Sequence, residues 1–433
     1  MRTVIRNCKL YFDGKIVENC FLIMDAPLIS GFGVDYGAQL AHDVHFDAKG
    51  RLLLPGLIDL HVHLRDQGLS YKEDFWSGTA SAVLGGVTSV IDMPNNVPPT
   101  ATPSDLTERM KLAKDKILAN VGFTCKPSAD HALNSELVKC GTIAFKMFIY
   151  EHMDGGKLDM PFVERVLESL SKLDRILMIH CHVRSRFSEV LELVRSGRAF
   201  KLCKVEKELA EKVLAVAKKY GPRVHICHVT CPRTVELINS YKSFVRVTSE
   251  VAIHHLLLDY SVLNSLGPMA HVDPPLRSKS TAKRLLDMLR EGMIDVVVSD
   301  HAPHAVFEKE GEDPKPGFPN LQLMAPLLMT QVKRGGLDLG LVVDRASARP
   351  AQIFGLRRRG AVAKGYYADL IEVDLKRKLK VKSEILVSKA KYTPFEGTTL
   401  TGVPVRTYVN GVCVNDDYTI IGKGGEGVVL TPW

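Results

Sequence analysis

Two histidines, two residues apart, end an apolar run in the segment Leu57-Ile58-Asp59-Leu60-His61-Val62-His63. Side chains two positions apart on a strand point to the same side, so His61 and His63 can reach one metal ion. Arg65 continues the same face if the strand extends that far. A His-x-His pattern alone is a weak sign of metal binding, so its companions decide its meaning.

A lysine interrupts a second apolar run, in Phe145-Lys146-Met147-Phe148. A buried lysine without a partner is costly and rare. Two interpretations stay open at this point. Either the ammonium of Lys146 extends to the rim of the fold, or its charge is removed, for example by reaction with CO₂ to give a carboxylate that bridges metal ions.

Three further polar side chains end apolar runs, namely His180, His228 and Asp300. Together with the first two histidines and the lysine they form a set of nitrogen and oxygen ligands that suits zinc or a similar divalent ion. A bridged pair of ions would generate hydroxide near neutral pH and polarise a carbonyl. We expect Asp300 to accept the proton of the water and to pass it to a leaving nitrogen.

The elements that position these residues alternate along the chain. Short β-branched apolar runs alternate with stretches of helical periodicity, such as Lys72–Leu84, Pro161–Leu173 and Glu206–Lys219. There are eight such runs: Gly56–Leu64, Val87–Met93, Val121–Cys125, Ile143–Tyr150, Arg175–Cys181, Arg223–Val229, Phe244–Val251 and Ile294–Asp300. This alternation predicts an α/β protein with a (β/α)₈ TIM barrel, and an open doubly wound sheet is the alternative. In such a barrel the active site lies where the strands end.

The two ends of the chain have a different pattern, with short alternating strands and tight turns at Asp13-Gly14 and Asn410-Gly411. We expect residues 1–52 and 350–433 to form one small composite β-sandwich domain. Residues 53–349 would then form the metal-dependent catalytic barrel.

Composition excludes several classes of protein. The 433 residues are 45% hydrophobic and 24% charged, as in an ordinary globular protein. We expect a soluble, cytoplasmic protein, because no apolar run approaches the ~18 residues of a membrane span and no signal peptide is evident. The formal charge of +8 is spread along the chain, which argues against nucleic-acid binding. The nine irregularly spaced cysteines favour free thiols.

Five motifs, in order, give the chain a recognisable resemblance. They are Pro55-Gly56-Leu57-Ile58-Asp59-Leu60-His61-Val62-His63-Leu64-Arg65, Asp92-Met93-Pro94-Asn95-Asn96, His225-Ile226-Cys227-His228-Val229, Ser299-Asp300-His301-Ala302-Pro303-His304 and Tyr392-Thr393-Pro394-Phe395-Glu396-Gly397. The set resembles the amidohydrolase superfamily, and within it the dihydroorotases of the type with a carboxylated lysine. The match covers nearly the whole chain.

The resemblance implies the reversible cyclisation of N-carbamoyl-L-aspartate to L-dihydroorotate in pyrimidine biosynthesis. It implies two zinc ions bridged by carboxylated Lys146, and Asp300 as the acid/base group. The first ion would be held by His61, His63, Lys146 and Asp300, the second by Lys146, His180 and His228, and the free carboxylate of the substrate by Arg65, Asn95 and His304. A homo-oligomer and an association with aspartate carbamoyltransferase are further partner expectations.

Three departures from the family pattern leave roles open. His182 stands where an acidic residue is usual, and Asp273 replaces an asparagine. The loop Tyr150-Glu151-His152-Met153-Asp154-Gly155-Gly156 lacks the Thr-Phe pair of the animal relatives, so its contacts cannot be inherited.

Two other functions compete with this one. A related cyclic amidase (a hydantoinase, dihydropyrimidinase or allantoinase) would share the metal residues, but its substrate lacks the carboxylate that Arg65 would bind. A metal-free relative acting as a scaffold would be expected to have lost ligands, and here every expected ligand is present.

Overall fold

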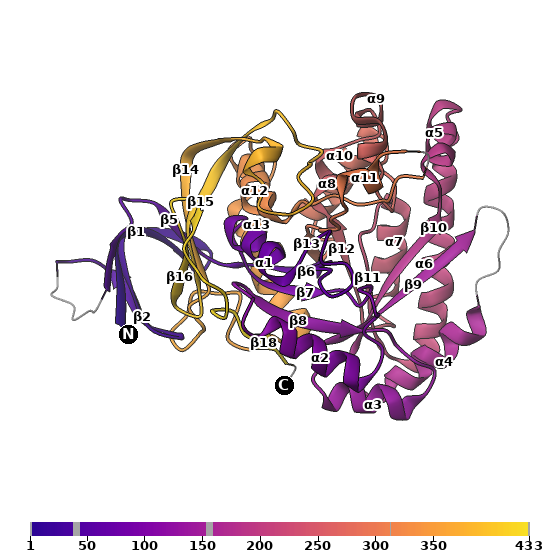
Figure 1. Cartoon of the computed structure of the whole chain (residues 1–433), viewed down its shortest axis with the longest axis horizontal. Coiled ribbons are helices and arrows are strands. Elements are labelled where there is room, and N and C mark those ends of the chain that lie inside the picture. Colours follow the sequence, from indigo (N-terminus) through magenta and orange to yellow (C-terminus); the bar gives the residue numbers. More distant parts are fainter. Residues whose placement is uncertain (1, 38–43, 153–158, 312, 432–433) are drawn as a thin grey trace.

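A computed structural model describes residues 2–37, 44–152, 159–311 and 313–431. Its centre is a barrel of eight parallel strands in chain order (Figure 1). The strands are β6 (Leu57–Val62), β7 (Val87–Asp92), β8 (Asn120–Cys125), β9 (Ala144–His152), β10 (Ile176–Arg184), β11 (Arg223–Ile226), β12 (Val247–Ala252) and β13 (Val296–Val298). The barrel closes where Val62 pairs with His301, beyond the end of β13. The predicted (β/α)₈ fold is therefore confirmed.

Helices connect the strands and cover the outside of the barrel (Figure 1). Between the barrel strands lie α1 (Phe75–Leu84), α2 (Pro103–Ala113), α3 (His131–Lys139), α4 (Met160–Ser171), α5 (Phe187–Arg195), α6 (Phe200–Tyr220), α7 (Pro232–Tyr241), α8 (Ile253–Leu257), α9 (Val262–Leu266) and α10 (Lys279–Arg290). After β13 follow α11 (Val306–Lys309), α12 (Met324–Lys333), α13 (Leu339–Val343) and α14 (Arg349–Phe354).

The helix starts follow local capping chemistry. The first predicted helix, from Lys72, begins at Phe75 instead, because the Asp74 side chain accepts the Ser77 backbone N–H and so caps it there. The helix predicted from Glu206 begins six residues earlier, at Phe200, and ends at Gly221, whose left-handed backbone (φ 74°) stops the helix.

Strands from both chain ends build a second, mostly antiparallel sheet beside the barrel (Figure 1). Its order is β17-β16-β15-β14-β5-β1-β2-β3, with β4 also paired to β1, and the ladders join all nine strands in one sheet. The strands are β1 (Arg2–Phe12), β2 (Lys15–Asp25), β3 (Leu28–Val34), β4 (Val44–Asp47), β5 (Leu52–Pro55), β14 (Leu370–Lys380), β15 (Thr399–Val409), β16 (Val412–Asp416) and β17 (Thr419–Ile420). The predicted hairpin turns at Asp13-Gly14 and Asn410-Gly411 are present, each with both residues in the left-handed region.

The last strand, β18 (Val429–Leu430), leaves this sheet and pairs in parallel with β8 of the barrel. The C-terminal segment therefore connects the two sheets.

The interior of the barrel contains a buried apolar cluster. Buried side chains of the strands, among them Ile58, Ile91 and Met178, cluster with Ile353 and Phe354 of α14. This packing leaves the polar strand ends as the part of the barrel where chemistry can occur.

Among the described helices, none is long and apolar enough to cross a membrane. All nine cysteines are free.

Candidate active site

A cavity of about 200 Å³ opens at the carboxyl ends of the barrel strands. Eight of the nine side chains predicted from the sequence line it: His61, His63, Arg65, Asn95, His180, His228, Asp300 and His304. The ninth, Lys146, is 1% exposed and contacts the ring of His61. The structure thus brings together all nine predicted residues, from strands far apart in the sequence.

His61, His63 and Asp300 form a compact group of possible metal ligands. The Nε2 atoms of His61 and His63 lie 3.6 and 3.7 Å from Asp300 Oδ1. These separations are too long for hydrogen bonds, yet all three atoms face the same space.

The other nitrogen of each of these two rings is held by a neighbour. His61 Nδ1 contacts a carboxylate oxygen of Glu250, and His63 Nδ1 lies 2.7 Å from Asn95 Oδ1. Since these oxygens are acceptors, Nδ1 carries the proton in both rings. The lone pair of each ring is then on Nε2, which faces Asp300, as in a metal-binding histidine.

Lys146 is surrounded by groups that do not neutralise its charge. Its Nζ lies 3.3 Å from His61 Nε2 and 3.0 Å from Cys227 Sγ, and 5.0 Å from the centre of the Phe148 ring. Among the described residues no carboxylate lies within ion-pair distance of Nζ. A buried ammonium in such a place is unfavourable, which argues against the interpretation that it extends to the rim.

His180 and His228 face each other at the far side of the same group, with His180 Nδ1 2.9 Å from His228 Nε2. Two nitrogen ligands about 2.1 Å from a tetrahedral ion lie about 3.4 Å apart, so a small opening of this pair would admit one. His228 Nδ1 is buried and has no hydrogen-bond partner among the described residues.

The donor set fits a metal centre. Imidazole nitrogens, a carboxylate and a buried lysine converge on one space. Nitrogen and oxygen donors of this kind suit zinc and similar divalent ions.

Burial also keeps the histidines neutral, as metal ligands must be. It lowers the pKa of His61 to about 4 and that of His180 to about 3. The pKa values of His63 and His228 lie well below the usual range for the same reason. For the Asp300 carboxyl, burial raises the pKa well above its usual range.

The backbone is strained at three of these positions. Arg65, His228 and Asp300 have φ values of 57°, 30° and 48°, in the left-handed region that residues other than glycine rarely adopt. Such conformations concentrate at functional sites, where the surrounding structure holds them.

Arg65 differs from the prediction in one respect. Strand β6 ends at Val62, so Arg65 does not continue its face. It reaches the cavity from a left-handed turn whose carbonyl accepts a hydrogen bond from Arg109 Nη2 at 2.9 Å. Its guanidinium donates to the Pro303 carbonyl at 3.2 Å, and its Nη2 lies 3.3 Å from His304 Nε2.

His304 lies between two cations, because Lys72 Nζ is 3.2 Å from its Nδ1. Burial, and then the charges of Arg65 and Lys72, hold the pKa of His304 well below its usual range. Lys72 Nζ also pairs with Glu308 Oε1 at 2.7 Å, which compensates its charge, so Arg65 is the cation that lines the cavity beside neutral His304.

Glu250 is the functional residue that the sequence did not single out. It lies fully buried on β12 and contacts His61, while its Oε2 is 3.0 Å from His225 Nε2. His225 Nδ1 in turn lies 2.7 Å from Thr248 Oγ1. The available signal was a charged residue inside an apolar run, Val247–Ala252.

The roles of Asp273 and His182 become visible in the structure. Asp273 lines the cavity, with Oδ2 3.8 Å from His180 Nε2 and Oδ1 3.4 Å from His182 Nδ1. His182 Nε2 accepts from Arg277 Nη2 at 2.9 Å. These two residues therefore contact His180 and connect it to a buried arginine.

The Tyr392 motif supports the wall of the cavity, because the Tyr392 hydroxyl donates to the Gly317 carbonyl at 2.9 Å. The loop that lacks the Thr-Phe pair of the animal relatives lies partly outside the described residues. Residues 153–158, which include Met153, lie outside the described part of the chain, and so does the side chain of His152.

Comparison with known proteins agrees with this fold. Residues 52–414 match the family described as "Amidohydrolase family". The chain therefore belongs to the amidohydrolase family.

Similar proteins indicate a smaller group within this family. The chain is 33% identical to a dihydroorotase of Methanothermobacter thermautotrophicus, over 95% of this chain and 96% of that one. It is 34% identical to a dihydroorotase of Carboxydothermus hydrogenoformans (94% and 96%) and to the multifunctional protein CAD of Squalus acanthias, of which it covers 16%. Within the family, the chain belongs to the dihydroorotases.

Among solved structures, an L-hydantoinase (dihydropyrimidinase) from Arthrobacter aurescens superimposes with a TM-score of 0.91 at 26% identity, covering 99% of both chains. The barrel and the accompanying sheet are thus shared with other cyclic amidases.

Proposed function

We propose that this chain, a hydrolase acting on a cyclic amide, interconverts N-carbamoyl-L-aspartate and L-dihydroorotate in pyrimidine biosynthesis. The observation that carries the substrate assignment is Arg65, whose guanidinium lines the cavity beside His304. The match to dihydroorotases over nearly the whole chain supports the same reaction.

The proposed metal centre would hold two zinc ions, with carboxylated Lys146 as a ligand that both would share. His61, His63 and Asp300 would complete the first site, and His180 and His228 the second. Such ions lower the pKa of water and polarise a carbonyl. Carboxylation would remove the unfavourable ammonium of Lys146 and supply two oxygens between the two groups of histidines.

Asp300 is proposed to move the proton of the reaction. In ring opening, water adds to the amide carbon of dihydroorotate and the bond from that carbon to the ring nitrogen breaks. Asp300 accepts the proton of the water and delivers it to the departing nitrogen. Its Oδ1 lies 3.6 and 3.7 Å from the Nε2 atoms of His61 and His63, so the carboxylate faces the proposed metal centre, which supports this role.

Arg65, Asn95 and His304 are proposed to bind the free carboxylate of the substrate. The planar fork of arginine matches a carboxylate with two parallel hydrogen bonds. Asn95 uses its Oδ1 on His63, so its amide nitrogen is left to donate to a ligand.

A second candidate is a hydantoinase or dihydropyrimidinase, since a protein with that name shares the fold. An allantoinase is a further candidate of the same kind. Their rings carry no carboxylate, so Arg65 and His304 would face them without a partner. A buried arginine next to an uncharged ligand is unfavourable, which favours dihydroorotate.

Dihydroorotate and dihydrouracil test the proposal, because they differ only in that carboxylate. Replacing Arg65 with alanine should lower kcat/KM for dihydroorotate by about 100-fold, the effect of losing about 3 kcal/mol of charge-assisted hydrogen bonding. Any slow turnover of dihydrouracil should change by less than threefold, and metal per chain should stay the same.

The matched control for this variant is Arg165→Ala, on the exposed face of α4, which should behave as the wild type. If Arg65→Ala lowers turnover of both rings equally, or if it loses metal, Arg65 is a structural residue and the substrate assignment is wrong.

Several coarser features belong to the same proposal. We propose residues 53–349 as the catalytic barrel and residues 1–52 with 350–433 as the accompanying β domain. We also propose a cytoplasmic enzyme, which free cysteines favour. We propose in addition a homo-oligomer and, separately, an association with aspartate carbamoyltransferase; the similarity to one part of a multifunctional protein supports the second.

A further inference from the structure

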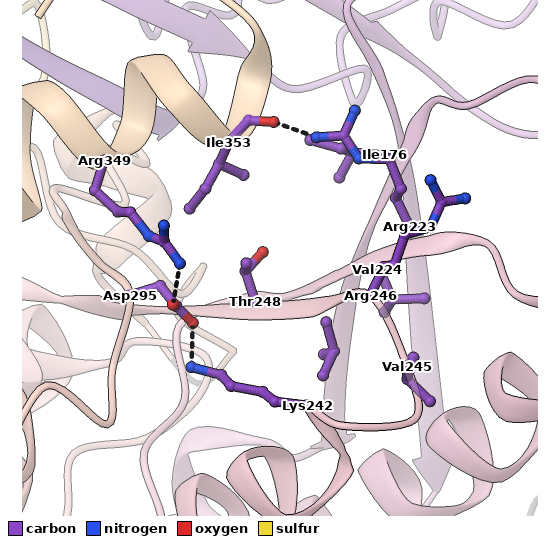
Figure 2. A pocket seen from close by; sticks show the side chains of 11 residues that line it. Ile176, Arg223, Val224, Lys242, Val245, Arg246, Thr248, Asp295, Arg349 and Ile353 are labelled. Carbon is purple, nitrogen blue, oxygen red and sulfur yellow. Dashed lines mark hydrogen bonds and ion pairs between the residues drawn. The ribbon is translucent and has the colours of Figure 1, made fainter.

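A second cavity, of about 340 Å³, lies at the opposite end of the barrel from the active site, and Figure 2 shows the side chains that line it. It is formed where β10, β11 and β12 begin, and is bordered by α14. In a (β/α)₈ enzyme this end of the barrel takes no part in the reaction, so the side chains here need another explanation.

The cavity is lined by four cations and one carboxylate. The cations are Arg223, Lys242, Arg246 and Arg349, and the carboxylate is Asp295. Asp295 is 3% exposed and lies 2.9 Å from Lys242 Nζ and 3.2 Å from Arg349 Nη2, the two contacts drawn in Figure 2. A single carboxylate therefore fixes two of the cations and leaves an excess of positive charge.

Arg223 is the cation with the least compensation. Its Nη2 donates to the carbonyl of Ile353 at 2.5 Å, and no carboxylate lies within ion-pair distance of it among the described residues. Burial, and then the neighbouring charges of Arg246 and Arg175, lower its pKa, while the charge of Asp174 raises it. The Nε of Arg175 is itself buried without a hydrogen-bond partner in the described part of the chain.

Arg246 also lines the cavity, and its Nη2 donates to the Gly221 carbonyl at 3.0 Å. It pairs with Asp174 at 2.7 Å, but both side chains are more than half exposed, so this pair is weak and can exchange partners. Arg223 and Arg246 could then present two guanidinium groups to one ligand.

The walls between the cations are apolar. Buried side chains of Ile176, Val224, Val245 and Ile353 line the cavity, together with Thr248. Cavities of this size with apolar walls and a few convergent polar groups are typical of small-molecule sites. A bare inorganic ion would leave these apolar walls without contacts.

We propose that this basal cavity binds a small phosphorylated metabolite, with the phosphate held by Arg223 and Arg246 and the organic part against the valine and isoleucine side chains. A phosphate carries about two negative charges and accepts the bidentate hydrogen bonds that arginine donates. The site uses no residue of the metal cavity, so this proposal does not depend on the proposed function.

Calorimetric titration of the metal-loaded full chain at low ionic strength tests the proposal. Adenosine 5′-monophosphate, inorganic phosphate and adenosine are the probes. We expect the monophosphate to bind more tightly than phosphate, and adenosine not to bind. If adenosine binds as well as the monophosphate, or if neither phosphate probe binds at millimolar concentration, the proposal is wrong.

Variants locate the binding site. We expect each of two substitutions, Arg223→Gln and Arg246→Gln, to weaken binding of the monophosphate by about tenfold, singly and in combination. These variants should retain the melting temperature and the dihydroorotate turnover of the wild type. Arg165→Gln, an exposed arginine on α4, is the control and should leave the affinity unchanged.

The variant Arg65→Gln shows which of the two cavities binds the monophosphate. Loss of monophosphate binding in Arg65→Gln, with retention in the Arg223 and Arg246 variants, would place the ligand at the metal cavity and overturn the proposal. Equal affinity for phosphate and the monophosphate would overturn the part that assigns the apolar walls to the ligand.

Discussion

At the level of one residue, the burial and the charge of Lys146 together predict that this side chain is chemically modified. Its Nζ is enclosed by His61, Cys227 and the Phe148 ring, none of which carries a negative charge at neutral pH. A lysine that is carboxylated and bound to metal would resolve this conflict. Lys146→Ala should therefore lose at least half of its metal and more than 100-fold in turnover, measured by elemental analysis and by ring opening of dihydroorotate.

A small carboxylic acid should partly restore the Lys146→Ala enzyme, because acetate or propionate can enter the space left and supply the bridging oxygens. His61→Ala is the control, since a carboxylate cannot replace a ring nitrogen held by Glu250. Full metal content and normal turnover in Lys146→Ala would rule out the bridging role.

The buried histidines make the metal-free chain sensitive to acid. Burial lowers the pKa of His61 to about 4 and that of His180 to about 3, whereas the unfolded chain protonates histidine near pH 6.5. The unfolded state thus binds protons first, and stability falls as the pH drops from about 6.5 toward 4.

Urea unfolding of chelator-treated protein at pH 7.5, 6.0 and 5.0 measures this effect. The midpoint should fall steadily across the series, and it should fall less in His61→Asn/His180→Asn. A midpoint that does not change between pH 7.5 and 5.0 would contradict the neutral, buried state of these rings.

Residue types at the ends of apolar runs, and a lysine inside one, predicted the six possible metal ligands, whereas the resemblance to a family predicted the roles of Arg65, Asn95 and His304. The supporting residues were harder to find. Glu250 lies inside a strand, and its partner His61 is 189 positions away in the sequence. Asp273 comes from a loop whose path to His180 depends on tertiary packing. Local pattern carries no information on such pairings.

At the level of elements, a helix fixes the conformation of the loop that holds Arg65. Arg65, Asp66 and Gln67 follow one another in the left-handed region. Arg109 of α2 holds this loop, because it donates to the Arg65 carbonyl and the Gln67 side chain and pairs with Asp92 at 2.6 Å. Both members of that pair are 1% exposed.

Arg109→Met should lower the free energy of unfolding by about 3–5 kcal/mol, because it leaves Asp92 buried and unpaired. It should also lower turnover through the displaced Arg65 loop. Urea unfolding and steady-state kinetics measure the two effects. The double variant Arg109→Met/Asp92→Asn removes the unpaired charge and should recover part of the stability, but not the turnover. A double variant as unstable as Arg109→Met would show that charge burial is not the cause.

The strands were predictable as elements because a parallel strand buried on both faces is a continuous apolar run. The residues at which the strands end were harder to predict. Strand β6 stops at Val62, three residues before Arg65, since the barrel closes there through Val62 and His301. A contact between the first and last strands cannot be deduced from either segment alone.

At the scale of the whole molecule, two sheets share one chain. Alternation of strands and helices predicted the barrel, and hairpin turns predicted the β structure at both ends. The strand connections between distant segments required the structure: β14 pairs with β5, and β18 returns to the barrel beside β8. Such pairings depend on which edges remain free after the barrel has closed.

The most direct measurement follows ring opening of L-dihydroorotate beside hydantoin, dihydrouracil and allantoin, with metal per chain determined on the same protein prepared without chelators. We predict turnover of dihydroorotate at least 100-fold above the other rings, with one to two zinc ions per chain, as the donor set and Arg65 require. Turnover of an uncharged ring in preference to dihydroorotate would contradict the substrate assignment. Turnover without bound metal would contradict the metal centre itself.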